Sequence, residues 1–488
     1  MMFIVCTIVT ELIEEKAEDG KEMTDEKLAL LEHITYIDEN VLKAAGIDKE
    51  LLEVKDEKSV VRILKIFDDK ALDNLRNYRK KTLFNIGNEE KQNIVDGALI
   101  SGKNWANIIE TIKNDEELKN LVVKDSEQIT TKKGKKYNLQ ICYQDPFSKQ
   151  GIITYKGTTG YEEWDDNVKG ISLKDTPCQD NALKFFQRNE KSFDDIVLVG
   201  HSKGANKAMY TTIVSDSDKI SKCIGMDGQG FSNEFFKEYE AQIEKHGSKI
   251  TNYSVDRDFV HVLMKQIPNS EQKYCEAYGV QKWAQFHTPF SMFKSQDGKM
   301  ELNGSDKSPV FVNTNENRYT ALLRKFTTYL MDKGKPEDVE KIVNYIGPFV
   351  GDFLGNGSFL KAIQQAKGSN FINLIRIFKE AIQFSKTENV TLKDWRGFFR
   401  TFGLKDTGED NTESIDNQQT VYNVKTDENV IEYPTLESQD SLKSKKIITE
   451  QRDPYEKKYM FKSHKPEAET INQVISIEQP QWDVECER

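Results

Sequence analysis

The spacing of apolar positions changes at about Tyr137, from helical repeats to short runs of strand length. From there, strand-like runs alternate with amphipathic stretches of helix length. Strands joined through helices pair in parallel, because the helix returns the chain across the sheet. The expected strands are YNLQICYQ, GIITYKG, IVLVG, CIGMDG and KITNYSV, and the expected helices are Gln179–Phe193, a stretch through Val214 and Asn233–His246. The pattern therefore predicts an α/β core with a mostly parallel sheet and flanking helices.

Helical periodicity dominates both sides of this core. Residues 11–130 are expected to be mainly helical, with helices at Thr24–Val41, Val60–Phe67 and Lys91–Asn114. Further helices are expected at Tyr319–Lys333, Glu337–Leu354, Phe371–Phe384 and in ENVTLKDWRGFF. From about Leu404 the chain is polar with little apolar periodicity, which predicts a disordered or loosely docked tail. The predicted division is a helical lead-in over 1–135, an α/β core over 136–300, a helical addition over 301–403 and a tail over 404–488.

The net negative charge of the chain limits the classes of partner that it is expected to bind. Its 488 residues carry a formal net charge of −11, without a long run of Lys and Arg. Bulk electrostatics therefore exclude nucleic acid as an expected partner. The six scattered cysteines form no CxxC pair, so neither a disulfide framework nor a zinc site is expected. The start, MMFIVCTIVTELIEEK, is a poor secretion signal, which predicts a cytoplasmic protein or one exported without a cleavable signal.

The strongest chemical signal is Gly200-His201-Ser202-Lys203-Gly204. It follows the run IVLV and precedes ANKAMYTTIV, so a strand, a sharp turn and a helix are expected in the order that a nucleophile elbow needs. The two glycines leave room for the neighbouring chain, and the start of the helix favours negative charge beside the serine. The short GxSxG pattern also occurs in ordinary turns, and its strand and helix context favours Ser202 as a nucleophile.

A serine nucleophile needs a histidine base, which follows it in α/β-hydrolases. The histidines after Ser202 are His246, His261, His287 and His464. His246 ends a polar helical stretch and His464 lies in the tail. His287, in WAQFHTPFSMF after the last expected strand, is the favoured base, and His261 is the alternative.

The histidine in turn needs an orienting carboxylate, which this fold delivers at the end of a strand. The strand KITNYSV runs into Asp256-Arg257-Asp258. Asp258 is favoured over Asp256 and over Asp227 of MDGQGF, although each is also a residue type common in solvated turns.

An oxyanion intermediate needs two N–H donors. The residue after the nucleophile, Lys203, is expected to supply one. The second is expected from the end of an earlier strand, where residues 152–160 (IITYKGTTG) run into Gly-flanked threonines. The alternative there is a simple glycine turn.

Together these residues resemble the class 3 lipase superfamily, and most closely a bacterial branch with a GHSKG elbow. The matching motifs are an FRGT-like Tyr155–Thr158, the pair Trp164-Asp165, Gly200–Gly204, a DGPGF-like Asp227–Phe231, Asp258–Leu263 and His287–Phe290. The resemblance covers about residues 25–300 and implies an α/β-hydrolase fold. It also implies Thr158 as the second oxyanion donor. Lys156 replaces the usual Arg, which keeps the charge but not the bidentate geometry.

The reaction implied is hydrolysis of a carboxylic ester through an acyl-enzyme, by Ser202, His287 and Asp258, with the N–H groups of Lys203 and Thr158 holding the oxyanion. Lipid acyl esters, from acylglycerols or phospholipids, are the expected substrates, with transient contact to a membrane surface, and no metal or organic cofactor is expected.

The helices over 301–400 are predicted to wall an acyl groove or form a lid. One alternative is an esterase or thioesterase for small acyl groups. Another is a weak or inactive hydrolase-fold binding or effector protein whose tail docks a protein partner.

Overall fold

The computed structural model describes residues 23–48, 51, 58–79, 95, 100–130, 136–158, 166–167, 169–278, 286–296, 299–300, 302, 310–333 and 369–401. These residues all belong to a compact unit, Met1–Glu409. Several sequence predictions lie outside the described residues: Trp164-Asp165, the helix Glu337–Leu354, His464 and the tail. The four-part division of the chain remains a prediction.

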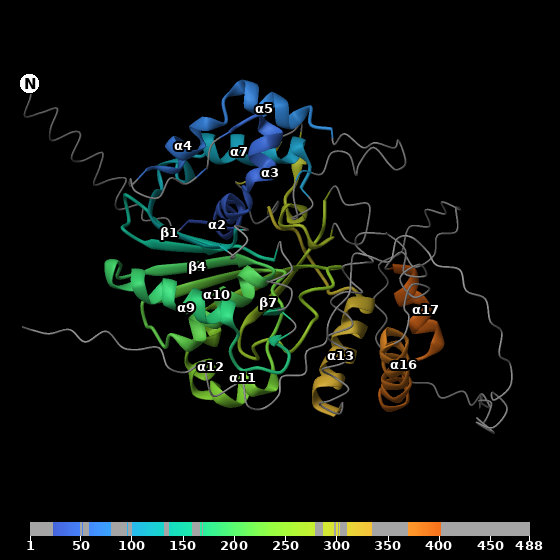
Figure 1. The fold of residues 1–488 in the computed structure, drawn as a ribbon. Coiled ribbons are helices and arrows are strands. Elements are labelled where there is room, and N and C mark those ends of the chain that lie inside the picture. Colours follow the sequence, from blue (N-terminus) through green and yellow to red (C-terminus); the bar gives the residue numbers. More distant parts are fainter. Residues whose placement is uncertain are drawn as a thin grey trace, which may run out of the picture. The chain divides into compact units, whose positions relative to one another are not determined.

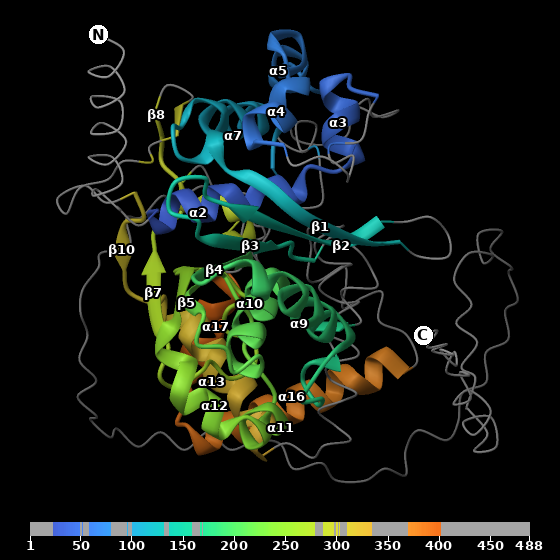
Figure 2. The same cartoon turned by 90° about the vertical axis from the view of Figure 1, so that its left-hand side faces the viewer.

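An eight-stranded sheet forms the centre of this unit (Figures 1 and 2). Its order is β1-β2-β3-β4-β5-β6-β7-β10, with β3 to β7 parallel and the strands at both edges antiparallel. The strands are β1 (Val122–Thr130), β2 (Lys136–Gln144), β3 (Gly151–Tyr155), β4 (Ile196–His201), β5 (Ile220–Met226), β6 (Ile250–Val255), β7 (Glu271–Cys275) and β10 (Asn313–Thr314). A short hairpin of β8 (Ser295–Gln296) and β9 (Lys299–Met300) stands apart from it. The predicted α/β-hydrolase-like fold with a mostly parallel sheet is confirmed.

Helices cover both faces of the sheet (Figure 2). Because the parallel strands follow one another in order, right-handed crossovers place their connecting helices on a single face. These are α9 (Pro177–Asn189), α10 (Lys203–Val214), α11 (Asn233–Glu238) and α12 (Glu240–His246). The opposite face is covered by helices from the N-terminal part of the chain: α2 (Asp25–Glu32), α3 (Glu39–Ala45), α4 (Val60–Ile63), α5 (Asp69–Arg76) and α7 (Gly102–Asn114).

Strand β4 shows why a strand that is covered on both faces has an apolar sequence. Ile196 and Leu198 join the core under α9 and α10, whereas Val197 and Val199 join the core under α2 and α7. Successive side chains of a strand point to opposite faces, so a strand buried on both sides must be apolar throughout. The continuous run IVLV is therefore the mark of a central strand, and it positions the residues that follow it.

The sequence predictions missed β1 and β7, along with the two-residue strands β8, β9 and β10. Residues 122–130, expected within a mainly helical region, form β1, which pairs antiparallel with β2 through two register shifts. Its side chains are half-buried and mostly polar, so its backbone pairing rather than an apolar pattern defines it. Residues 271–275 form β7, a parallel strand beyond the last expected one. Its sequence, EQKYC, is mostly polar and half-buried for the same reason.

The helix expected over Thr24–Val41 divides into two. Thr24 caps α2 as expected, accepting a hydrogen bond from the Lys27 N–H at 3.4 Å. The chain then turns through a short 3-10 helix, His33–Tyr36, and becomes extended at Ile37. Asp38 starts α3 by accepting hydrogen bonds from the N–H groups of Asn40 and Val41. A second N-cap inside the apolar repeat is the local reason for the break.

The C-terminal helices of the described chain are α13 (Arg318–Lys333), α16 (Ser369–Thr387) and α17 (Leu392–Thr401). Thr391 and Asp394 cap α17 reciprocally, since each backbone N–H donates to the side chain of the other. Tyr319, Leu323 and Phe398 pack against Phe259 and Val260. The addition thus contacts the loop that follows Asp258, and its role as a lid stays a prediction. None of the described helices combines the length and apolar character needed to cross a membrane.

A buried carboxyl on α2 gives the fold a pH dependence. Glu32 is fully buried, and this burial raises its pKa to about 8, although Thr35 and Lys207 act in the opposite direction. Between its ordinary value of 4.5 and about 8, Glu32 holds a proton in the folded chain and loses it in the unfolded chain. Folding therefore takes up a proton, and stability falls by about 1.4 kcal/mol per pH unit across this window.

Glu32→Gln is expected to remove this dependence. The neutral amide keeps the shape of the protonated acid. The free energy of unfolding of the variant should therefore increase relative to that of the wild type as pH rises from 5.5 to 8. Urea unfolding at both pH values measures the difference. Parallel pH dependences for the two proteins would contradict a buried, protonated Glu32.

Candidate active site

The candidate residues lie where the parallel strands end. Register pairs Tyr155 with Gly200, His201 with Met226, and Met226 with Tyr253. The C-terminal ends of β3 to β6 are therefore level. The segments that follow these strands carry Thr158, Ser202, Asp227 and Asp258 to the same edge of the sheet, where the ligand sites of parallel α/β sheets form.

Ser202 occupies the sharp turn between β4 and α10. Its backbone has φ 58° and ψ −123°, a strained conformation that costs about 1–3 kcal/mol in a residue other than glycine. The turn packs so tightly that a Cβ on Gly200 would lie 2.2 Å from the Gly204 main chain, and one on Gly204 would lie 1.9 Å from the Tyr155 carbonyl oxygen. Both positions must therefore be glycine. The start of α10 directs its free N–H groups to the serine side of the turn.

A line of two hydrogen bonds joins Ser202 to a carboxylate. The His287 Nε2 lies 2.8 Å from the Ser202 Oγ, and the His287 Nδ1 lies 2.8 Å from Asp258 Oδ1. Ser202 is 6% exposed and Asp258 is fully buried, whereas the His287 side chain is 19% exposed. The structure thus brings together the three residues that the sequence selects, from segments 56 and 29 positions apart in the chain.

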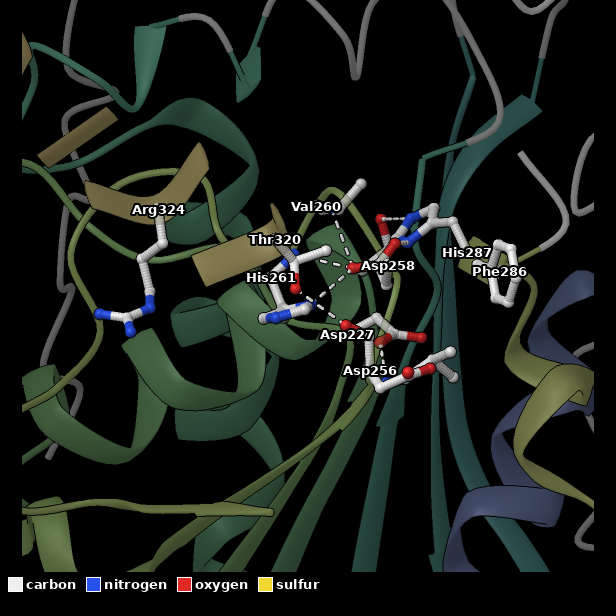
Figure 3. A network of polar contacts seen from close by, with 12 residues as sticks. Asp227, Asp256, Asp258, Val260, His261, Phe286, His287, Thr320 and Arg324 are labelled. Carbon is white, nitrogen blue, oxygen red and sulfur yellow. Dashed lines mark hydrogen bonds and ion pairs between the residues drawn. The ribbon is translucent and has the colours of Figure 1, made fainter. Parts of the chain in front are cut away.

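Asp258 is held as a carboxylate by its neighbours (Figure 3). Its Oδ2 accepts hydrogen bonds from the backbone N–H groups of Val260 at 2.9 Å and His261 at 2.8 Å. Burial alone would raise the pKa of Asp258, but the charge of His287 and the hydrogen bonds from both histidines bring that pKa below its ordinary value. Asp258 is therefore ionised and oriented before any ligand binds.

The alternative base, His261, lies on the other side of the same carboxylate (Figure 3). Its Nδ1 is 3.1 Å from Asp258 Oδ2, and its Nε2 lies 3.9 Å from Glu316. Among the described residues, no hydrogen bond joins His261 to Ser202. His246 is further removed from this group, since it bonds to Asp216 at 2.8 Å.

The two alternative acids, Asp256 and Asp227, contact groups other than His287. Asp256 contacts the neighbouring Arg257 at 3.4 Å. Asp227 is fully buried and accepts a hydrogen bond from the Val255 N–H at 2.8 Å. Burial and then the charge of Asp258 raise the pKa of Asp227 well above its ordinary value, which favours the protonated form of this carboxyl. Among the described residues, neither carboxyl is hydrogen bonded to His287.

Metal-ligating residue types also meet here. Two sets hold ligand atoms within 4.8 Å of one another: a partly buried set of His201, Asp227 and His287, and a buried set of Asp227, Asp258 and His261. Both nitrogens of His287, however, already bond to Asp258 and Ser202. One residue of each set, His287 and Asp258, is thus already engaged in the hydrogen bonds that lead to Ser202.

The two expected oxyanion donors lie on either side of Ser202, one at the start of α10 and the other after the end of β3. Lys203 is the first residue of α10, and Thr158 follows β3 after Gly157. A Cβ on Gly157 would lie 3.1 Å from the Ser202 Cβ, so this segment touches the elbow directly. Among the described residues, no group accepts a hydrogen bond from the backbone N–H of Lys203 or Thr158. Thr159 and Gly160, part of the same predicted loop, lie outside the described residues.

Tyr36 was not selected from the sequence. Its hydroxyl accepts a hydrogen bond from the Gly157 N–H at 3.0 Å and lies 2.8 Å from the His201 Nδ1. The ring of His201 in turn lies 4.8 Å from that of His287. Burial and then the charge of His287 lower the pKa of His201 well below its ordinary value, so His201 is neutral. Tyr36 comes from the N-terminal part of the chain, where no local motif signals its position.

A known protein family matches the core of this chain. Residues 114–297 match the model of the Mbeg1-like family, which agrees with the predicted resemblance to the lipase superfamily, while the GHSKG branch stays a prediction. No curated protein matches the chain in sequence. The Rhizomucor miehei lipase in its propeptide complex is 9% identical, with 50% of this chain and 84% of that chain covered and a TM-score of 0.26. The Lip2 lipase of Yarrowia lipolytica is 11% identical, with 46% and 82% covered and a TM-score of 0.25. These values are too low to assign an activity, and the chain is similar to the Mbeg1-like family over its core.

Proposed function

We propose that this chain is a serine-dependent carboxylic ester hydrolase. The observation that carries the proposal is the unbroken line from Asp258 through His287 to Ser202, with both hydrogen bonds at 2.8 Å. A serine hydroxyl becomes nucleophilic when an oriented base accepts its proton. The strained turn and the start of a helix at Ser202 are features that such a nucleophile needs. Among the described residues, the backbone N–H groups of Lys203 and Thr158 have no acceptor, as oxyanion donors require.

In the proposed reaction, Ser202 Oγ attacks the ester carbonyl carbon while His287 Nε2 takes the hydroxyl proton. The carbonyl oxygen becomes an oxyanion, held by the backbone N–H groups of Lys203 and Thr158. His287 then gives its proton to the leaving alcohol, which leaves an acyl group on Ser202. Water attacks this acyl-enzyme by the same route, again with His287 as base, and releases the acid and the free serine.

The electrostatics favour a single buried negative charge at this site. Asp258 is ionised and neighbours both histidines, so it stabilises His287 when this residue becomes an imidazolium. The raised pKa of the buried Asp227 disfavours a second negative charge beside it. The Lys203 side chain does not serve as an alternative base, because its Nζ is paired with Asp166 at 2.8 Å and turned away from this role.

We infer lipid acyl esters as the substrate class, on the resemblance of the motifs to class 3 lipases. The experiment compares release of fatty acid from p-nitrophenyl butyrate, p-nitrophenyl palmitate and phosphatidylcholine vesicles, with Ser202→Ala as the blank. A lipase or phospholipase should prefer the long-chain or vesicle substrate. Preference for short soluble esters would instead favour the small-substrate esterase. Absence of release from every ester by folded wild type would contradict the proposed function and favour the inactive binding protein.

A further inference from the structure

A pair of adjacent polar residues, Asp166 and Asn167, lies behind the two expected oxyanion donors. Both side chains are buried, with exposed fractions of 4% and 9%. Each reaches a different donor residue: Asp166 contacts the side chain of Lys203, and Asn167 contacts that of Thr158. Asp166 and Asn167 therefore connect the end of β3, on one side of Ser202, with the start of α10 on the other side.

The contact of Asp166 with Lys203 is a buried ion pair. The Lys203 Nζ lies 2.8 Å from Asp166 Oδ2, and the lysine side chain is 1% exposed. Asp166 is itself fixed to the start of α9, because it accepts hydrogen bonds from the Thr176 hydroxyl at 2.7 Å and the Cys178 N–H at 2.9 Å. Burial alone would raise the pKa of Asp166, but the Lys203 charge and these hydrogen bonds bring that pKa below its ordinary value. The carboxylate is thus a fixed, charged anchor.

The contact of Asn167 with Thr158 is a directed hydrogen bond. The Asn167 Nδ2 donates to Thr158 Oγ1 at 2.9 Å, while the Asn167 Oδ1 accepts from Gln229 Nε2 at 3.2 Å. The amide is therefore held in one orientation from two sides.

A long side chain at position 203 is what makes this connection. Lys203 supplies an oxyanion donor through its backbone, so the side chain adds nothing to that donor directly. Its ammonium is, however, locked to a carboxylate that is bonded to α9. A charge buried with its partner strongly resists displacement, because separation would leave both charges unsolvated. The ion pair thus fixes the backbone at the start of α10 to the segment that also holds Thr158.

We propose that Asp166 and Asn167 form a clamp that sets the positions of both oxyanion donors, through the Lys203 side chain and the Thr158 hydroxyl. This inference rests on the proposed function and deepens it. Asp166 and Asn167 are positioning residues, since they touch neither the substrate nor the reacting atoms. Because the donors must meet the oxyanion in the transition state, loosening the clamp should act on kcat and leave KM nearly unchanged.

The test uses two clamp variants, Asn167→Ala and Lys203→Met, in the full chain. We expect kcat for p-nitrophenyl butyrate to fall by about 10-fold to 100-fold in each, with KM within about twofold of wild type. Lys203→Arg keeps the ion pair and is expected to retain most of kcat. The matched control is Lys27→Met, because Lys27 is also a buried lysine paired with carboxylates, Asp115 at 3.0 Å and Glu117 at 3.1 Å, and it is expected to keep the wild-type kcat.

Hydrogen exchange supplies a second measurement that does not need turnover. Peptides spanning residues 151–158 and 200–206 should exchange faster in both clamp variants than in wild type, and at the wild-type rate in Lys27→Met. Unchanged exchange in these peptides, or a kcat that falls no more than in Lys27→Met, would overturn the clamp. If wild type hydrolyses no ester, the proposed function fails, and the exchange rates alone then support or overturn the clamp.

Discussion

His287→Ala is expected to lower kcat for ester hydrolysis by about five to six orders of magnitude. The imidazole Nε2 is 2.8 Å from Ser202 Oγ, and no other base among the described residues bonds to that hydroxyl. Without it the serine keeps its proton and the leaving alcohol receives none. Because His287 is partly exposed, its loss should leave the fold largely intact. Single-turnover and steady-state rates with p-nitrophenyl butyrate measure the effect.

The matched control is His261→Asn, which keeps a nitrogen donor near Asp258 Oδ2. His261 binds the same carboxylate at 3.1 Å but does not reach Ser202. We expect its replacement to lower kcat by no more than about tenfold, as the loss of one supporting hydrogen bond would. An equal loss in both variants would contradict the assignment of His287 as the base.

Asp258→Asn is expected to lower kcat by about 10⁴-fold. The asparagine fits the same space, but its amide cannot balance the imidazolium, and it favours the wrong tautomer of His287. Asp258 also holds the backbone of Val260 and His261, so a moderate loss of stability should accompany the loss of rate. The kcat and the unfolding midpoint are measured on the same preparation.

Asp256→Asn provides the comparison two residues away. Asp256 is turned to Arg257, and its replacement should leave kcat within about threefold of wild type, as for a residue outside the reacting group. A large loss in Asp256→Asn with a small loss in Asp258→Asn would mean that the orienting acid is Asp256.

The elbow was predictable because all its signals are local. The run IVLV marks a strand covered on both faces, and Gly200 and Gly204 mark the close approach of β3 and α10. His287 and Asp258 were selected from chain order and flanking motifs, and the structure places them in line with Ser202. Their catalytic roles remain a prediction until activity is measured.

The residues that support the site could not be predicted from a single sequence. Tyr36 bonds to Gly157 across 121 positions, and Asp166 and Asn167 act on residues that adjoin them only in the folded chain. Such contacts depend on tertiary packing and leave no periodic or spacing signal. The edge strand β1 and the strand β7 were missed for a related reason, since half-buried polar strands take their structure from their neighbours.

Labelling with a fluorophosphonate probe tests whether Ser202 is an activated nucleophile, because such a probe reacts with a serine that its base has activated. Wild type, Ser202→Ala and His287→Ala are compared after each is shown to be folded, and the labelled peptide is identified by mass spectrometry. We expect strong labelling of wild type on Ser202 that is lost in both variants. Folded wild type that stays unlabelled, or a label on another residue, would contradict it.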